Sequence, residues 1–177
     1  YSPSGQFLTQ FGQHGINDGE FIRISSVVVD NSGDVYVGGA YDIQKFTNTG
    51  NFLFKMSNSV DEYSPRFNTD SMNNLFILDN NAKTVKKYSS NGNFISEWSV
   101  DESVITKVYS QYIGQILLDS SDNIFVTNGN QFVVYSNDGI FIISFDIPLA
   151  NSWGNQFIWW DRISINSNDE IIGFLKN

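Results

Sequence analysis

The chain has 177 residues, of which 41% are hydrophobic and 15% aromatic, so it can bury a substantial core and we exclude a disordered chain. Its 10 Lys and Arg residues against 19 Asp and Glu residues give a net charge of -9, and no basic cluster offers a surface to phosphates, which excludes nucleic acid as a partner. Cysteine is absent and no apolar run approaches the roughly 20 residues of a membrane-spanning helix, so we expect no disulfide, thiolate metal site or transmembrane segment.

The predicted strands follow one another in a repeating order. An apolar segment from Phe7 to Phe11 comes first, and a strand pair at 27–30 and 35–37 and strands at 43–46 and 52–56 follow it. The same order returns twice and then begins again. The later predicted strands are 67–70, 75–77, 85–88 and 94–98; then 116–119, 124–126, 132–135 and 141–145; and finally 163–166 and 171–172.

A glycine turn marks the start of the last strand in each repeat. The glycines are spaced at roughly 45 residues, a period typical of repeat proteins, and each precedes an aromatic residue by two positions. A large apolar residue follows that aromatic residue four positions later, and strand alternation predicts that the two share one buried face. The glycines are Gly5, Gly50, Gly92 and Gly139, and the later apolar residues are Phe11, Met56, Trp98 and Phe145.

Polar turns join the predicted strands within each repeat. The segments 31–34 and 47–50 and their later copies are rich in Asp, Asn, Ser and Gly, which favour tight turns. Three hairpin links in each repeat imply four antiparallel strands. This is the blade of a β-propeller, so we predict an all-β chain of four-stranded antiparallel blades.

The first full repeat resembles the NHL repeat. The matching residues are Phe11-Gly12, Gly15, Gly19-Glu20-Phe21, Val27-Val28-Val29-Asp30, Gly33-Asp34-Val35-Tyr36-Val37 and Ile43-Gln44-Lys45-Phe46. Ile24 and Ser26 depart from the pattern, where the family favours Pro and Gly. The resemblance implies a propeller that is usually six-bladed and that binds proteins in most contexts, and its RNA-binding members rely on a basic face that this chain lacks.

The repeats predict about three and three-quarter blades in a single propeller region, 1–177. We expect a partial blade at 1–11, full blades at 12–56, 57–98 and 99–145, and a second partial blade at 146–177. The simplest interpretation is part of a larger ring, for example one of six blades. A closed ring of four blades and a ring formed by two chains are the alternatives, because a propeller has to close or leave strand edges open.

Acidic side chains fall into two predicted groups. One group recurs at the same turn of each repeat, which favours a role in the turn over calcium binding; it comprises Asp30, Asp34, Asp70, Asp119, Asp122, Asp169 and Glu170. The other group lies in the links between blades and predicts an acidic binding rim; it comprises Asp18, Glu20, Asp61, Glu62, Asp101 and Glu102. The only histidine, His14, is interpreted as a loop residue, because one histidine cannot build a multi-histidine metal site.

Tryptophans supply the second candidate binding surface. Trp153, Trp159 and Trp160 crowd the last link between blades together with Phe157. Aromatic side chains of this kind give large contact areas for proteins or sugars at a low entropy cost. The alternative is core packing, which we favour for Phe157.

The leading functional hypothesis is a non-enzymatic binding or scaffold module for a protein or glycan partner, with no catalytic residue, no cofactor and no metal. A secreted or cell-surface location fits the acidic composition that is rich in Asn and Ser, and a cytoplasmic location is the alternative. A calcium-dependent enzyme resembling the lactonase or lyase propellers is the second hypothesis. The third is a structural assembly subunit whose open blade edges join neighbouring chains.

Overall fold

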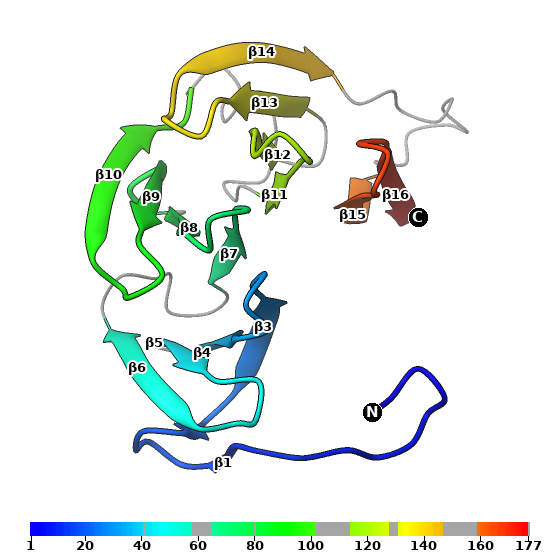
Figure 1. Ribbon diagram of the computed structural model, residues 1–177. Coiled ribbons are helices and arrows are strands. Elements are labelled where there is room, and N and C mark those ends of the chain that lie inside the picture. Colours follow the sequence, from blue (N-terminus) through cyan, green and yellow to red (C-terminus); the bar gives the residue numbers. More distant parts are fainter. Residues whose placement is uncertain are drawn as a thin grey trace. The chain divides into compact units, whose positions relative to one another are not determined.

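The computed structural model describes residues 1–40, 42–57, 65–79, 81–101, 114–127, 131–146 and 159–176, and in the last of these ranges the side chains of 163–173. All regular structure in these ranges is β-strand (Figure 1). The described residues contain no helix long and apolar enough to cross a membrane. The chain divides into two compact units, Tyr1–Arg66 and Phe67–Asn177, and each is described by itself.

The first unit contains one four-stranded antiparallel sheet. A short parallel pair, β1 (Gln13–His14) and β2 (Glu20–Phe21), precedes it along the chain. The sheet follows in sequential order with β3 (Ile24–Val29), β4 (Val35–Gly39), β5 (Asp42–Phe46) and β6 (Phe52–Ser57).

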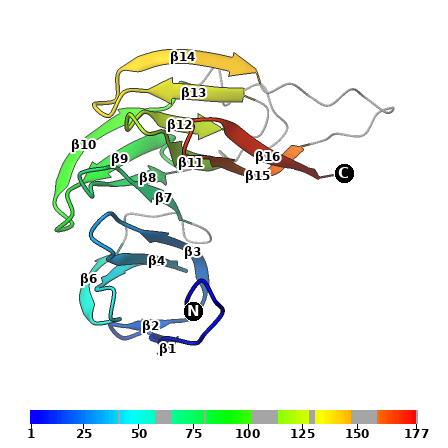
Figure 2. The ribbon, with the colours of Figure 1, turned by 45° about the vertical axis from the view of Figure 1, so that its right-hand side comes forward.

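The second unit contains two further four-stranded antiparallel sheets and a two-stranded one. The first comprises β7 (Arg66–Thr69), which begins at the last residue of the first unit, β8 (Leu75–Asp79), β9 (Thr84–Tyr88) and β10 (Phe94–Ser99). The next comprises β11 (Gln115–Leu118), β12 (Ile124–Thr127), β13 (Gln131–Tyr135) and β14 (Phe141–Asp146). The last pair is β15 (Trp159–Ile165) and β16 (Ile171–Lys176), and β15 lies beside β11 (Figure 2). These sheets confirm the prediction of four-stranded antiparallel blades.

One turn geometry closes the first and the last hairpin of each four-stranded sheet and the hairpin of β15 and β16. In residues 30–34, the Asp30 backbone N–H donates to the Asp34 carbonyl and the Gly33 N–H donates to the Asp30 carbonyl, both at 2.9 Å. The Asp30 carboxylate also accepts bonds from the N–H groups of Ser32 and Asp34. The same backbone pattern occurs in residues 2–6, 47–51, 70–74, 89–93, 119–123, 136–140 and 166–170.

The fourth residue of each such turn has a positive φ. It is glycine in five turns, as the sequence predicted for four of them; the φ values at Gly5, Gly33, Gly50, Gly92 and Gly139 lie between 79 and 85 degrees. In the remaining three turns it is Asn73, Asp122 or Asp169, residue types that tolerate the left-handed region. Asp70 and Asp119 accept N–H bonds within their turns as Asp30 does, which supports the turn role of these recurrent carboxylates.

A β-bulge in each outer strand overturns the predicted sharing of one face. Phe52 pairs with Phe46, whereas Phe54 pairs with Lys45, so one additional residue enters the outer strand between them. The bulge shifts the alternation, and Phe52 and Met56 therefore lie on opposite faces of the sheet. The same shift separates Phe94 from Ser96 in β10, and the same irregularity occurs in β14.

The segment from Phe7 to Phe11 forms no strand, although the sequence predicted one. No described strand lies alongside it to accept its backbone hydrogen bonds, so the segment stays unpaired. Phe7 is 57% exposed, and its ring lies edge-to-face on that of Tyr1, with 5.7 Å between the centroids. Phe11 instead packs on the sheet of the first unit, with its ring centroid 5.2 Å from that of Phe46.

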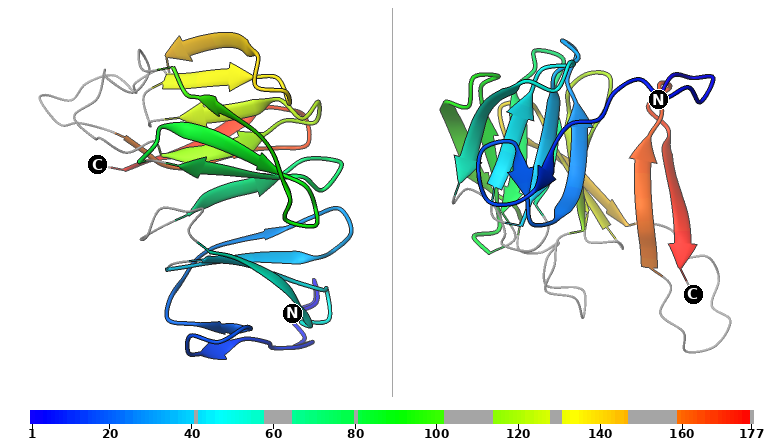
Figure 3. Two further views of the ribbon diagram at one scale, coloured as in Figure 1. Left: turned by 90° about the vertical axis from the view of Figure 1, so that its left-hand side faces the viewer. Right: turned by 90° about the horizontal axis from the view of Figure 1, so that it is seen from below.

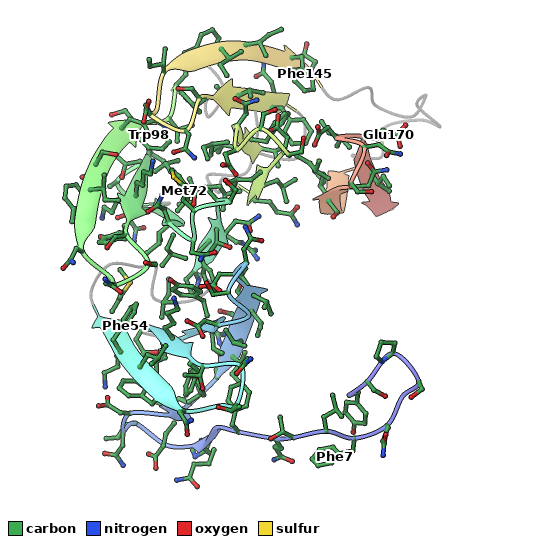
Figure 4. All side chains as sticks on the ribbon, viewed as in Figure 1. Phe7, Phe54, Met72, Trp98, Phe145 and Glu170 are labelled. Atoms are coloured by element: carbon green, nitrogen blue, oxygen red, sulfur yellow. The ribbon has the colours of Figure 1, made fainter. Side chains whose placement is uncertain are left out.

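The main core of the second unit lies between its two four-stranded sheets. Phe76 and Val85 from the first sheet pack with Ile124 and Val133 from the second, and all four are fully buried. Trp98 of the outer strand β10 closes this layer against Tyr135, with 6.1 Å between ring centroids (Figure 4). A smaller cluster joins Phe132 to Ile163 of β15.

Adjacent turns in the second unit are tied to each other by carboxylates. The Asp122 carboxylate accepts the backbone N–H of Ser71 at 2.8 Å, and Asp169 accepts that of Ser120 at 2.7 Å. Both carboxylates also accept the serine hydroxyl. These turns lie at one end of the strands (Figure 3).

The Asp169 contact predicts an acid-sensitive link between neighbouring turns. The hydrogen bond from the Ser120 hydroxyl, followed by that from its backbone N–H, lowers the pKa of Asp169 below the ordinary 3.8. Because the pKa is depressed in the folded state, the stabilisation is complete above 3.8 and is lost as the pH falls through the lowered value. We expect the hydrogen-exchange protection of the Ser120 amide to fall in that range, while the Val133 amide in the adjacent sheet serves as the reference. Unchanged Ser120 protection well below pH 3.8 would contradict the link.

Candidate binding loops

The two ends of the strands carry connections of different kinds. At the turn end every connection has the same length and geometry, as described above. At the opposite end, the connections from β6 to β7, from β10 to β11 and from β14 to β15 span 58–65, 100–114 and 147–158. The predicted acidic residues lie in these connections and in the segment before β3. This end is therefore the candidate binding end of the sheets.

The loop that joins β1 to β2 is organised by Glu20. Its carboxylate accepts hydrogen bonds from the side chain of Gln13 at 2.7 Å and from the backbone and side chain of Asn17 at 3.0 and 2.9 Å. The backbone N–H of Asn17, followed by the amide of Gln13, lowers the pKa of Glu20. Gly15 lies so close that an added Cβ would come within 2.0 Å of the Glu20 carboxylate. Glu20, predicted as a binding residue, thus holds its own loop.

Gln44 fixes this loop to the sheet. It is fully buried in β5, accepts the Gly19 N–H at 2.8 Å and donates to the Glu20 carbonyl at 2.9 Å. Sequence reasoning did not identify Gln44 as a site residue. A polar amide inside the strand Ile43-Gln44-Lys45-Phe46 was the available signal, because a buried amide has to find partners nearby.

Asp18 is the accessible carboxylate of the same loop. Its side chain is 59% exposed and forms an ion pair with Lys55 of β6 at 2.7 Å. The hydrogen bond that Lys55 donates to Asp18 raises the pKa of Lys55, whereas burial raises the pKa of the nearby Asp42. The Lys55 ammonium is therefore balanced by the carboxylates of Asp18 and Asp42, and these three side chains together carry a net negative charge.

In the second unit, Asp101 is the second residue of the connection 100–114 and is exposed. The residue before it, Val100, is buried and donates its N–H to the Lys83 carbonyl. Asp101 itself donates its backbone N–H to the Tyr135 hydroxyl at 2.9 Å, and burial raises the pKa of this Tyr135. The base of the loop is therefore anchored, and Asp101 is held at the surface.

The other predicted site residues differ in where they lie. Trp159 and Trp160 belong to β15, where their backbones pair with Lys176 and Leu175, and not to the link between sheets as predicted. The reason is that β15 begins four residues before the predicted strand. Trp153, Asp61, Glu62 and Glu102 lie outside the described residues.

His14 lies exposed in the short strand β1. Among the described residues, no three His, Asp or Glu side chains come together in a way that could hold a metal ion. The candidate loops, as far as the structure describes them, present two exposed carboxylates on anchored backbones, those of Asp101 and of Asp18, which is paired with Lys55. Such an arrangement suits the recognition of positively charged groups.

Four-stranded antiparallel sheets in sequential order, each packed on the next within the second unit, define a β-propeller-type fold. Solved β-propeller structures are similar to it. A structure of streptogramin B lyase superposes with a TM-score of 0.62 at 16% identity, over 85% of this chain and 47% of that one. Virginiamycin B lyase from Staphylococcus aureus gives a TM-score of 0.60 at 14% identity over 85% and 48% of the two chains. BamB from Moraxella catarrhalis gives 0.55 at 14% identity over 81% and 44%.

The chain spans about half the length of these solved structures. At such low identity the likeness concerns the fold alone. A scan against protein-family models found no match, and a search of curated proteins found none either.

Proposed function

We propose that this protein is a non-enzymatic binding module of the NHL-repeat type that holds a basic segment of a partner protein through its acidic loops. The contrast between the two ends of the strands supports this proposal. At the turn end, the carboxylates of Asp30, Asp70 and Asp119 accept hydrogen bonds within their own turns. At the loop end, Asp18 and Asp101 are exposed.

The charge of the loop segments indicates the chemistry of the partner. Six carboxylates lie in the segments 12–23, 58–65 and 100–114, against two basic residues, Arg23 and Lys107. Carboxylates at a rim increase the rate at which a basic partner associates and reject acidic ones. Connections of unequal length on a regular sheet scaffold are also the usual place for recognition.

A charge-matched pair of variants tests the proposal. The loop variant carries Asp101→Asn and Glu102→Gln, and the control carries Glu97→Gln in β10 and Asp138→Asn in the turn before β14, where both residues are exposed. Each variant changes the net charge from -9 by the same two units, so the long-range field is altered equally.

We expect peptides selected from a random phage-displayed library on the unmodified protein to be rich in Lys and Arg. They should bind the loop variant roughly tenfold more weakly, since one rim ion pair contributes up to about 1 kcal/mol, and bind the control as they bind the parent. Equal weakening of both variants would mean that only the net charge matters and would contradict the proposal. Binding that requires added calcium would support the enzyme alternative instead.

A further inference from the structure

Two of the sheets bury a lysine at the same position, but only one of these lysines forms an ion pair. In the first unit, the ammonium of Lys45 lies beside the carboxylates of Asp30 and Asp34. The corresponding residue of β9 is Lys87, which is 6% exposed. Lys87 forms no ion pair among the described residues, and Asn74 stands where the first sheet has Asp34.

The ammonium of Lys87 instead contacts Asn137, which lies in the turn between β13 and β14. It donates to the Oδ1 atom of Asn137 and, at 3.3 Å, to the backbone carbonyl oxygen of the same residue. Because Oδ1 is bonded directly to Cγ, the lysine nitrogen also lies near the carbonyl carbon of the amide. The fully buried ring of Phe76 lies under the ammonium, with 5.3 Å from Nζ to the ring centroid. Lys87 is therefore held against the Asn137 amide in a site from which most water is excluded.

The other side of the Asn137 amide faces a carboxylate. The Nδ2 atom of Asn137 donates to the Oδ2 atom of Asp70 at 3.1 Å. Asp70 is 2% exposed, and its Oδ1 atom accepts the backbone N–H groups of Met72 and Asn74 at 3.0 and 2.7 Å. The turn thus fixes the carboxylate in place. The amide of Asn137 lies between a buried amine and a buried acid, and all three residues belong to the second unit.

We propose that Lys87 and Asn137 react with each other to form an intramolecular isopeptide bond. Lys87 supplies the nucleophile, Asn137 the amide carbon and Asp70 a carboxylate that carries the proton. Reacting groups that are held in contact gain a large rate advantage over the same groups on separate molecules. The bond joins β9 of one sheet to the turn after β13 of the next. The proposal does not depend on the acidic loops.

The reaction exchanges the side-chain nitrogen of Asn137 for that of Lys87. A proton first moves along the two hydrogen bonds of the amide: the Lys87 ammonium gives one to Oδ1, and Nδ2 gives one to the Asp70 carboxylate. The neutral Nζ atom then attacks Cγ, and Asp70 returns its proton to Nδ2. A further proton moves from Nζ to Nδ2 in the tetrahedral intermediate, and the Cγ–Nδ2 bond breaks. The departing ammonia takes the proton of Oδ1, so ammonium ion is released, the new Nζ–Cγ amide bond remains, and no group is oxidised or reduced.

The mass of the purified protein tests the proposal directly. After storage of the folded protein at neutral pH, we expect an intact mass below that of its sequence by one ammonia molecule. Trypsin should fail to cleave after Lys87, because an amide replaces the ammonium that trypsin recognises. Tandem mass spectrometry of the digest should then find a branched peptide that joins Lys87 to Asn137. A mass equal to that of the sequence, with normal cleavage after Lys87, would overturn the proposal.

Two variants separate the nucleophile from the proton carrier. Lys87→Met removes the amine. Asp70→Asn removes the carboxylate but keeps an acceptor oxygen for the turn, as Asn166 does in the last turn. We expect both variants to keep the full mass of their sequences and to give only linear peptides. Lys86→Met is the control and should lose ammonia as the parent does, because adjacent residues of a strand lie on opposite faces.

Two further results would count against the proposal. Asn91 precedes Gly92, and an asparagine in this position can lose ammonia alone by cyclising on its own backbone. That product gives linear peptides and normal cleavage after Lys87, so the digest distinguishes it from the isopeptide bond. An Asp70→Asn variant that unfolds cooperatively in urea and still forms the branched peptide as fast as the parent would contradict the role of Asp70.

Discussion

Replacing Lys45 by Met is expected to reduce the free energy of unfolding of the first unit by about 3–5 kcal/mol, the range for removal of one partner from a buried ion pair. The Lys45 ammonium lies 3.0 Å from the Asp30 carboxylate and 3.2 Å from that of Asp34, and it lies over the ring of Tyr36. Lys45 and Asp30 are each only 4% exposed. Without the ammonium, the buried Asp30 carboxylate would lose its counter-ion.

The Lys45 ion pair persists over the physiological pH range. Burial acts to lower the pKa of Lys45, but its interactions with Asp30 and Tyr36 outweigh that effect and raise the pKa above the ordinary 10.5. The stabilisation that accompanies a raised lysine pKa is complete below the ordinary pKa of 10.5. It is lost only as the pH rises through the higher pKa of the folded protein. Urea unfolding at neutral pH therefore measures the loss in Lys45→Met directly.

Two further variants control for the size of the residue and the loss of charge. Lys55→Met removes an exposed lysine of the same sheet and should have a much smaller effect. Adding Asp30→Asn to Lys45→Met should restore part of the stability, because Asn166 holds the corresponding turn 166–170 with the same acceptor oxygen. A double variant less stable than Lys45→Met alone would contradict the ion-pair explanation.

Gly50→Ala is expected to destabilise the first unit more than Gly33→Ala, although both glycines belong to one sheet and have φ values of 85 and 84 degrees. The left-handed backbone alone costs about 1–2 kcal/mol at either position. At Gly33 an added Cβ would be in ordinary contact with Asn48 at 3.6 Å, whereas at Gly50 it would overlap the Phe11 side chain at 2.7 Å. Such overpacking adds about 1–3 kcal/mol.

A double-mutant cycle assigns that difference to Phe11. Phe11→Gly removes the Cβ, Cγ and Cδ1 atoms that the new Cβ would meet, so Gly50→Ala should cost less in the Phe11→Gly background. The same change should leave the cost of Gly33→Ala unaltered. The measurement is the midpoint of urea unfolding for the set of variants. Equal costs for Gly50→Ala in both backgrounds would mean that Phe11 does not lie over this turn.

The strand order could be predicted because local chemistry determines it. Residues that begin each tight turn, such as Asp30 and Thr47, carry side chains that bond to the turn itself, and glycine occupies most positions of positive φ. These signals act over five residues and are therefore visible in the sequence. The bulges were missed because the additional residue in the outer strand has no distinctive type; it is Leu53 in β6 and Ile95 in β10.

The candidate site was less predictable because its contacts are distant in the sequence. Glu20 was expected at a binding rim, but Gln13 and Asn17 occupy its carboxylate, and Gln44, more than twenty positions away, supports the same loop. The tryptophans were assigned to a link because the register that places Trp159 opposite Lys176 extends beyond the predicted strand. Alternation within a strand gives no information on where the strand begins.

Every sheet pairs strands that are neighbours along the chain, and this sequential order has a kinetic consequence. Each hairpin closes only a short loop, so each step in forming a sheet loses little conformational entropy. One sheet can therefore form before the next has been synthesised. A chain built in this way can form its sheets one after another during translation. It can also come apart one sheet at a time when a protease or a mechanical pull acts on an end.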